Sequence, residues 1–473
     1  MQENPFREDR EELKELLEQY VNLRSGKSHS FIEEDAFERI IDYFDDQDDL
    51  AKALEAAETG LDYFPYSSLL LIKKADLLIA TRHYADALEL LDQAALYDGS
   101  DINLYILRTD AYLALDQQLN AVQVLEEALL LFEGEEKLEL LFELADVYDD
   151  YEEFDKVFDC LKLILEQEPV NEEALYKICF WTDFTGRNEE SIRLHQAIIE
   201  EYPYSELAWF NLAAAYQGIK LYEKAIDAYQ YAVVIDEKFD YAYRNMGDAY
   251  IRMRKYKEAI EVLERVLELT RPEEVIYEAI GHCHHRLGKF AQARFNYRKA
   301  SHMSPQDTKL NYKIALTYIN EEQWESAVKQ LEIAMRLNRN APEYNLAMGE
   351  CMLNLGNYKE AVIRFGVVVH HRPRNVTARE SLIRCLYKAG DFDLAAKQCL
   401  AALEATDNKP LFYFLYSAAL FAGGKAKEAL IQLENGLSKA PKLVKKFVEI
   451  NPSILQSSQV VDALARYKKS KKL

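Results

Sequence analysis

Residues 206–239 read ELAWFNLAAAYQGIKLYEKAIDAYQYAVVIDEKF, and the same arrangement of residues returns along most of the chain at intervals of 34. The clearest marker is a series of alanines spaced 34 residues apart: Ala225, Ala259, Ala293, Ala327, Ala361, Ala395 and Ala429. Twelve units fit into residues 34–443 when one slip of two residues is allowed near Gly134. A fixed period of this length is the sequence signature of a repeat protein.

Each unit contains two helical patterns separated by a turn. Apolar or small residues occupy positions 4, 7, 8 and 11 and then positions 20, 24 and 27 of a unit, which is the spacing of one helix face. Five units carry a glycine at position 15, where the turn is expected: Gly186, Gly288, Gly356, Gly390 and Gly424. A unit of this length falls below the roughly 40 residues that an independent core needs. We therefore expect the units to be stable only when they stack on one another.

One unit carries a recognisable family pattern. The residues that form this pattern are Trp209, Leu212, Ala213, Tyr216, Ala225, Tyr229 and Ala232. They resemble the signature of the tetratricopeptide repeat (TPR) family, and the resemblance extends over residues 34–443. It implies an all-α fold, an α-solenoid in which helical hairpins stack into a right-handed superhelix. We expect an N-terminal capping helix in residues 1–33, twelve repeats in one continuous solenoid, and C-terminal capping helices with a basic tail in residues 444–473. Long repeat chains of this style suggest a bacterial protein.

Charge is distributed unevenly along the chain. The 473 residues include 81 acidic and 57 basic residues, a net charge of −24, and residues 1–170 alone hold 43 acidic and 14 basic residues. This excess of acid disfavours nucleic-acid binding, because phosphate neutralisation needs clustered lysine and arginine. It favours a basic protein or peptide partner for the N-terminal third. No run approaches the roughly 20 apolar residues of a membrane span, so we expect no membrane insertion and a cytoplasmic chain.

The first helix of each unit supplies the candidate binding residues. In TPR proteins this helix lines a concave groove that holds peptides or partner helices, and positions 6 and 9 point away from its apolar stripe. Position 9 is aspartate in the first four units: Asp42, Asp76, Asp110 and Asp146. Position 6 holds lysine or asparagine in four units: Lys177, Asn211, Asn245 and Lys313. The aspartates predict an acidic groove for a partner that carries lysine or arginine, and the amides suit hydrogen bonds to a peptide backbone. The alternatives are an ordinary solvated face and surface asparagines without a partner.

Motifs for chemistry are missing from the sequence. There is no nucleophile elbow, phosphate-binding loop, dinucleotide fingerprint or zinc-protease motif. The run at residues 282–285, His-Cys-His-His, contains metal-ligand types, but neighbouring residues on a helix diverge by about 100°. We therefore expect no enzyme, no cofactor and no metal site. The predicted function is a protein-interaction scaffold, as a monomer or homodimer; the alternative is a structural subunit that assembles with itself, or into a larger complex, through its ends or convex face.

Overall fold

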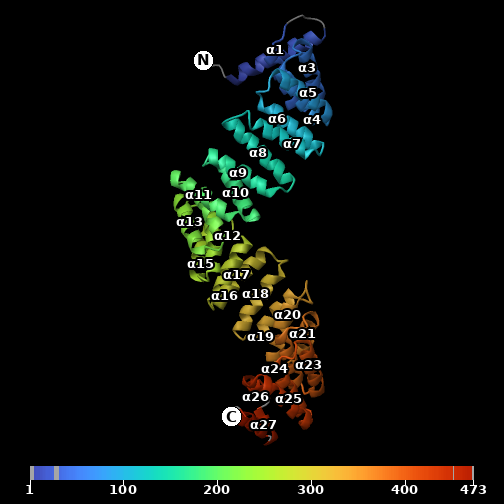
Figure 1. The fold of residues 1–473 in the computed structure, drawn as a ribbon, viewed down its shortest axis with the longest axis vertical. Coiled ribbons are helices and arrows are strands. Elements are labelled where there is room, and N and C mark those ends of the chain that lie inside the picture. The colour runs from blue at the N-terminus through green and yellow to red at the C-terminus, as the bar shows by residue number, and fades with distance from the viewer. Residues whose placement is uncertain (1–4, 26–30, 451, 457, 471–473) are drawn as a thin grey trace. The chain divides into compact units, whose positions relative to one another are not determined.

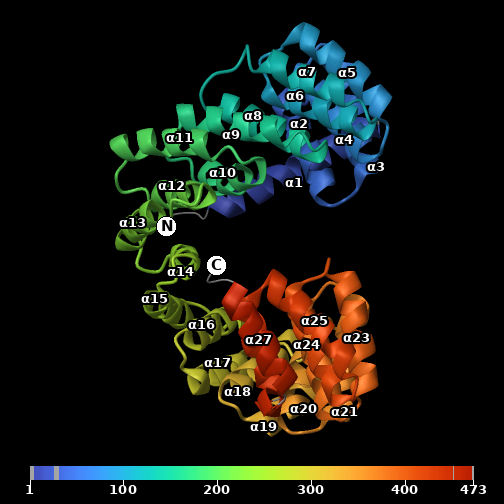
Figure 2. The ribbon, with the colours of Figure 1, turned by 60° about the horizontal axis from the view of Figure 1, so that its bottom comes forward.

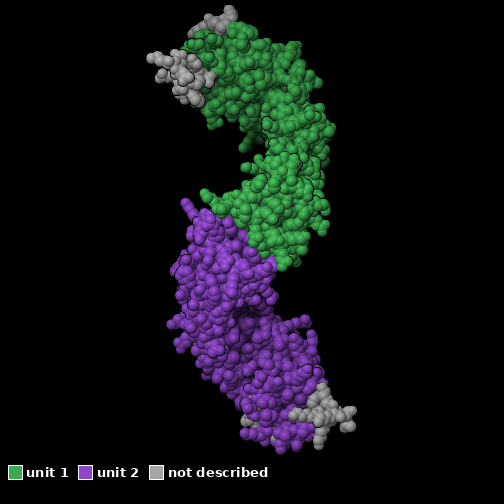
Figure 3. Space-filling view, turned by 90° about the vertical axis from the view of Figure 1, so that its left-hand side faces the viewer, with its two compact units in different colours: residues 1–242 green, residues 243–473 purple. Residues whose placement is uncertain are grey.

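The computed structural model describes residues 5–25, 31–450, 452–456 and 458–470 (Figure 1). Within these ranges every regular element is a helix and none is a strand, which confirms the predicted all-α class. The chain divides into two compact units, residues 1–242 and residues 243–473, drawn in different colours in Figure 3.

In its described residues, unit 1 contains thirteen helices and the start of a fourteenth. They are α1 (Pro5–Arg24), α2 (Glu34–Asp46), α3 (Leu50–Tyr63), α4 (Ser68–Ala80), α5 (Tyr84–Tyr97), α6 (Ile102–Ala114), α7 (Gln118–Ala128), α8 (Glu135–Asp150), α9 (Phe154–Gln167), α10 (Glu172–Thr185), α11 (Asn188–Glu201), α12 (Glu206–Gly218) and α13 (Tyr222–Ile235). Helix α14 (Asp240–Arg252) begins in unit 1 and continues into unit 2.

Unit 2 continues the same alternation of helices. It contains α15 (Tyr256–Leu269), α16 (Glu274–Arg286), α17 (Phe290–Met303), α18 (Thr308–Asn320), α19 (Trp324–Ala334), α20 (Pro342–Asn354), α21 (Tyr358–His371), α22 (Val376–Lys388), α23 (Phe392–Ala405), α24 (Pro410–Ala422), α25 (Ala426–Lys439), η1 (Pro441–Leu443), α26 (Val444–Ile450), η2 (Pro452–Gln456) and α27 (Ser458–Ser470). Near the C-terminal end, α25 packs against both α24 and α27 (Figure 2).

The helix starts follow the 34-residue period of the sequence. The first helix of a repeat begins at position 1 of its unit in every repeat except the fourth, where α8 begins at Glu135. The two-residue slip lies there: Gly134 has a φ of 63°, and its carbonyl accepts a hydrogen bond from the Leu138 amide at 3.3 Å. Helix α8 is 16 residues long, α7 ends early at Ala128, and the connection between them, residues 129–134, is two residues longer than the four-residue connections on either side.

Small residues bring the two helices of a hairpin close together. Ala225 and Ala259, at position 20, are fully buried. At position 8, a Cβ added to Gly247 would lie 2.7 Å from the Leu263 side chain, and one added to Gly281 would lie 2.7 Å from Tyr297. Such contacts are shorter than van der Waals distance, so a larger residue would push the helices apart.

The first helices of successive repeats also touch one another. In unit 1, α2 contacts α4, α4 contacts α6, and α6 contacts α8; in unit 2, α18, α20, α22 and α24 form a similar series. The predicted repeat solenoid is therefore confirmed as the fold, with first helices side by side in one layer. A residue type that recurs at one position of the first helix consequently forms a row across this layer.

Candidate functional site

Five carboxylates form what we call the acidic row of unit 1. They come from one face of four first helices: Asp42 on α2, Asp76 on α4, Asp110 on α6, and Glu143 and Asp146 on α8. Asp42, Asp76, Asp110 and Asp146 are the predicted aspartates. Glu143 was not singled out from the sequence, although it occupies position 6, the same position as Lys177 one repeat later.

The carboxylates of the acidic row act on one another electrostatically. Burial among the helices raises the pKa of Asp76, and the charges of Asp45 and Asp42 raise it further. The pKa of Asp110 is raised by burial and then by Asp76. The pKa of Glu143 is raised by burial and then by Asp110 and Asp146. The row therefore stores like-charge repulsion from α2 to α8, which a positive ligand would relieve.

The surroundings of the row suit a concave surface. Asp76 and Asp110 are solvent-exposed, and yet burial is the largest cause of their raised pKa values. Partial burial disfavours the charged form of a carboxylate even where the side chain stays accessible to water. Unit 1 is hollowed along one side (Figure 3).

Among the described residues, lysines form ion pairs only with the two ends of the acidic row, although the charges of Lys73 and Lys177 also lower the pKa of Asp76 and Glu143. At one end, the Nζ atom of Lys73 lies 2.7 Å from Asp42, and at the other end, Nζ of Lys177 lies 3.5 Å from Asp146. Over the described residues, no lysine or arginine forms an ion pair with Asp76, Asp110 or Glu143. The middle of the row is therefore the part that is open to a basic ligand.

The predicted lysines of position 6 connect neighbouring repeats. Lys177 on α10 pairs with Asp146 on α8 and, at 3.0 Å, with Glu173 on its own helix. Lys313 on α18, in unit 2, pairs with Glu278 on α16. Both lysines are half-buried, and each joins one first helix to the previous one. The two lysines therefore stabilise the packing of neighbouring repeats, and they also belong to the candidate binding face.

Asn211 lies deeper than an open row would place it. Its side chain is 2% exposed. The amide nitrogen donates to the Leu175 carbonyl at 2.7 Å and to Nε2 of His195 at 3.2 Å. The side-chain oxygen of Asn211 is buried and accepts no hydrogen bond from the described residues. Asn245 is half-buried on α14 and belongs to unit 2, whereas Asn211 belongs to unit 1.

A pocket with aromatic walls lies beside Asn211, and we call it the aromatic pocket. It has a volume of about 250 Å³ and lies among α10, α12 and the start of α14. Its lining includes Tyr176, Cys179, Phe180, Phe210, Asn211 and Tyr241. The sequence alone did not predict this pocket, because its walls come from three repeats, although Phe210 and Tyr241 are aromatic at positions 5 and 2.

The histidine run of unit 2 is used for packing. His284 is buried at position 11, where other repeats carry core residues, and Nε2 of His285 lies 2.9 Å from the Asn320 amide nitrogen. Among the described residues, no cluster of three or more histidine, cysteine or carboxylate side chains is arranged to hold a metal ion. Within the same residues, none of the helices combines the length and the apolar character needed to cross a membrane.

Comparisons with known proteins find repeat proteins. Residues 187–361 match a family model described as the C-terminal ARM domain of tetratricopeptide repeat protein 21, and residues 365–410 match a tetratricopeptide repeat model. Similar solved structures include a TPR protein, YrrB, whose structure is described as having an unusual peptide-binding site. This chain is 19% identical to it, the match covers 39% of this chain and 95% of YrrB, and the TM-score is 0.35.

Two further solved structures are similar over more of the chain. One is a chain from the structure of the Cut9–Hcn1 hetero-tetramer of the APC/C, with which this chain shares 13% sequence identity. The match covers 85% of this chain and 98% of that chain, with a TM-score of 0.36. The other is the C-terminal part of a TPR repeat-containing protein from Cytophaga hutchinsonii, with which this chain shares 16% sequence identity. The match covers 54% of this chain and 99% of that chain, with a TM-score of 0.42.

Proposed function

The chain is a tetratricopeptide-repeat protein, a member of a family whose proteins generally serve as interaction scaffolds, and from this premise we propose that unit 1 binds a basic, extended segment of another protein along the acidic row. The binding is non-catalytic, and it uses the carboxylates of α4, α6 and α8 as its main contacts. The observation that supports this proposal is the middle of the row, Asp76, Asp110 and Glu143, where among the described residues no ion pair forms and each pKa is raised.

Electrostatics gives the physical reason for the choice of partner. Each carboxylate in the row raises the pKa of the next, so the ionised row is under mutual repulsion before a ligand arrives. A guanidinium or ammonium group placed between two rungs is attracted by both, and like charges aligned on one face also speed the encounter. Affinity and association rate should therefore both fall as ionic strength rises.

The spacing of the row predicts the spacing of the ligand's charges. Packed helices lie about 8 to 10 Å apart, and an extended chain advances about 3.3 Å per residue. A segment that crosses the first helices therefore meets a new carboxylate about every third residue. We expect peptides with arginine at every third position to bind more tightly than peptides of equal charge whose arginines are adjacent.

The test compares a neutralised row with a neutralised outer surface. The row variant is Asp76→Asn, Asp110→Asn and Glu143→Gln, and the matched control is Asp62→Asn, Glu89→Gln and Glu127→Gln. The control residues are exposed on the second helices α3, α5 and α7, so both variants lose three negative charges from unit 1. Binding of a labelled peptide with arginine at every third position is measured by fluorescence anisotropy in low salt.

The row variant should weaken peptide binding by about 3- to 150-fold, because it removes three charge pairs and each exposed pair is worth roughly 0.2 to 1 kcal/mol. The control variant should stay within about twofold of the unchanged protein, since only the overall charge differs. Equal losses in the two variants would mean that net charge alone attracts the peptide, and the proposed row would be wrong.

A second candidate function is self-association, and the distribution of charge favours considering it. Residues 243–473 hold 37 basic and 25 acidic residues, whereas residues 1–242 hold 20 basic and 56 acidic residues. Unit 2 of a second copy is therefore a basic surface that would compete for the acidic row. Light scattering across a range of concentrations, in low salt and in 0.5 M salt, separates the two functions: a mass of about 55 kDa throughout supports a separate partner.

A further inference from the structure

We propose that unit 2 binds an acidic segment of another protein in a pocket formed by α19, α20 and α21 (Figure 1). The segment places a large apolar side chain on a floor of methionines and its carboxylates on Arg336 and Arg339. We call this site the arginine pocket. It lies in the other unit from the acidic row and takes a ligand of the opposite charge, so it goes beyond the proposed function and does not depend on it.

The arginine pocket lies where the repeat pattern is interrupted. Helix α19 has 11 residues and ends at Ala334, whereas α17 and α21, the second helices on either side, have 14 residues each. The connection from α19 to α20, residues 335–341, is three residues longer than the four-residue connections that follow α17 and α21. Three residues of this connection line the pocket, which has a volume of about 530 Å³.

Methionines form the apolar floor of the pocket. Met335, Met348 and Met352 line it, and they are three of the seven methionines in the chain. Met335 and Met348 are almost completely buried, and Met352 is half-buried. Unbranched, polarisable thioether side chains adapt to the shape of an apolar group that packs against them. The floor therefore suits a large apolar side chain of the ligand.

Arginines determine the charge of the ligand. The charged residues that line the pocket are Arg336, Arg339, Arg364, Glu332 and Glu360. Arg364 is already neutralised, since its Nε and Nη2 atoms lie 2.7 and 2.6 Å from the Glu360 carboxylate. Arg336 and Arg339 are exposed, and over the described residues neither of them forms an ion pair. The open rim therefore presents two free guanidinium groups against one carboxylate, that of Glu332.

A buried amide fixes the backbone that carries one of these arginines. Asn345 on α20 is fully buried, and its side-chain nitrogen donates to the carbonyls of Arg339 and Ala341 at 2.8 and 3.0 Å. The side-chain oxygen of Asn345 lies 3.5 Å from Nη1 of Arg364. The connection is therefore held to α20 before a ligand arrives, which reduces the entropy that binding must overcome.

These features together select an acidic peptide segment as the ligand. A guanidinium group pairs with a carboxylate through two parallel hydrogen bonds, and the methionine floor requires an apolar group next to that carboxylate. A leucine with glutamates on both sides meets both requirements. Single-stranded nucleic acid is also negatively charged, but its bases stack on aromatic rings, and none of the residues that line the pocket, all within the described range 332–364, is aromatic.

The experiment measures the binding of three labelled peptides to the full-length protein by fluorescence anisotropy. The peptides share their flanking residues and differ in a central motif, which is Glu-Glu-Leu-Glu-Glu, Glu-Glu-Ala-Glu-Glu or Gln-Gln-Leu-Gln-Gln. A five-nucleotide single strand of DNA, with four phosphates, is the fourth probe. The buffer contains 0.15 M salt, because a Debye length of about 8 Å then screens the net negative charge of the rest of the protein.

The Glu-Glu-Leu-Glu-Glu peptide should bind about 5- to 50-fold more tightly than the alanine peptide, because its leucine leaves water for the methionine floor. It should bind about 2- to 30-fold more tightly than the glutamine peptide, whose amides carry no charge to pair with the two guanidinium groups. Equal affinities in either comparison would overturn the proposal. DNA that binds as tightly as the Glu-Glu-Leu-Glu-Glu peptide would overturn the assignment of a protein segment as the ligand.

Matched variants locate the binding site of the Glu-Glu-Leu-Glu-Glu peptide. The double variant Arg336→Gln, Arg339→Gln should weaken binding by about 2- to 30-fold. The control Arg254→Gln, Arg271→Gln should stay within about twofold of the unchanged protein. All four arginines are exposed in unit 2, so both variants lose two positive charges from one unit, and circular dichroism checks that both are folded. Glu332→Gln should tighten binding by about 1.5- to 5-fold, because it removes the carboxylate that opposes the ligand.

Equal losses in the two double variants would mean that the net charge of unit 2 attracts the peptide, and the arginine pocket would be wrong. Weaker binding in Glu332→Gln would also contradict the proposed position of the ligand. The arginine-containing peptide that tests the acidic row should bind equally well to the unchanged protein and to the Arg336→Gln, Arg339→Gln variant. Failure of the arginine pocket and failure of the proposed function are therefore separate results.

Discussion

A buried polar trio includes two exceptions to the repeat pattern, Ser191 and His195. Ser191 stands at position 20, where ten of the twelve repeats carry alanine, His195 stands at position 24, and Asn211 follows at position 6 of the next repeat. The three side chains are 1%, 0% and 2% exposed. Burial lowers the pKa of His195 to about 4, so the ring is neutral at pH 7 and joins Ser191 to Asn211. The network places the Asn211 amide at the aromatic pocket.

The neutral state of His195 predicts acid sensitivity. In the unfolded chain this histidine binds a proton near pH 6.5, but in the folded protein it does so only near pH 4. The unfolded state therefore binds more protons between these values, and stability is lost as the pH falls through them. The loss should approach about 3 kcal/mol by pH 4, since each pKa unit corresponds to about 1.4 kcal/mol.

Urea denaturation at pH 7, 5.5 and 4, followed by tryptophan fluorescence, measures this loss. His195→Gln should flatten the decline between pH 7 and pH 4, whatever its effect on stability at pH 7. His302→Gln, which changes an exposed histidine on α17, should keep the full decline. An unchanged slope in His195→Gln would show that other groups cause the acid sensitivity.

At the scale of elements, every repeat makes its turn with one residue in the left-handed region. Glycine occupies this position in five repeats, for example Gly356 with a φ of 77°. In the other seven, a residue with a side chain adopts a φ of 57° to 65°: Asp48, Arg82, Asp116, Glu152, Lys220, Arg254 and Glu322. Side chains destabilise this conformation by about 1 to 2 kcal/mol. Packing of the two helices therefore determines the turn, and glycine only relieves its strain.

Two glycines of one repeat provide a matched test of this point. Gly356 lies in the turn before α21, and Gly366 lies within α21 at a φ outside the positive region. A Cβ atom added at either position meets no atom within 4 Å, so only the backbone conformation differs. Gly356→Ala should destabilise the protein by about 1 kcal/mol, whereas Gly366→Ala should stabilise it by about 0.5 to 1 kcal/mol. Thermal and urea denaturation of the two variants checks the opposite signs; the same sign in both would contradict the argument.

Most helices could be predicted from the sequence, because the same residue classes recur in phase twelve times and each recurrence supports the others. The period does not predict the helix ends around Gly134, where α7 ends early at Ala128 and α8 begins early at Glu135. The acidic row was predictable for the same reason, since Asp76 and Asp110 repeat at one position. The aromatic pocket was not predictable, because it depends on how side chains from three repeats converge.

At the scale of the whole molecule, stability should be built from contacts between neighbouring repeats. Each helix contacts the elements adjacent to it in the stack, as in other repeat proteins. In unit 1, one hydrophobic cluster extends from Leu71 on α4 to Ala208 on α12, and a second cluster, which includes Phe37, joins α1 to α4. A change at one interface should therefore loosen nearby helices before distant ones.

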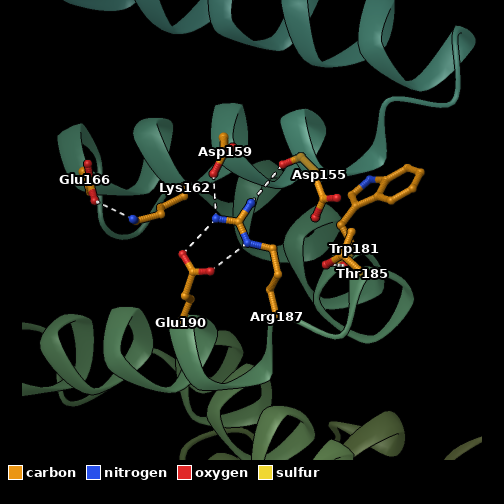
Figure 4. A network of polar contacts seen from close by, with 8 residues as sticks. All are labelled: Asp155, Asp159, Lys162, Glu166, Trp181, Thr185, Arg187 and Glu190. Carbon is orange, nitrogen blue, oxygen red and sulfur yellow. Dashed lines mark hydrogen bonds and ion pairs between the residues drawn. The ribbon is translucent and has the colours of Figure 1, made fainter.

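Arg187 forms one of the braces between repeats, at the start of α11 (Figure 4). Its Nε and Nη2 atoms donate to the Glu190 carboxylate at 2.9 and 2.8 Å. Nη2 also lies 2.7 Å from Asp159 on α9, and Nη1 donates to the Asp155 carbonyl at 3.0 Å. The guanidinium lies 4.2 Å from the centre of the Phe158 ring. These contacts raise the pKa of Arg187 and join the fourth repeat to the fifth.

Replacing this brace tests whether unfolding is local. Arg187→Met keeps a long side chain but leaves Asp159 and Glu190 without their partner, which should cost about 1 to 3 kcal/mol at this interface. Hydrogen exchange followed by mass spectrometry should speed up by about 5- to 100-fold in α9 to α11 and remain unchanged in α2 to α5. Arg265→Met is the control, because the ion pair with Glu268 on α15 and the contact with Tyr243 on α14 that it removes both lie inside one repeat. Equal acceleration in α2 to α5 and in α9 to α11 would mean that unit 1 opens as one cooperative body. The expectation that stability is the sum of contacts between neighbouring repeats would then be wrong.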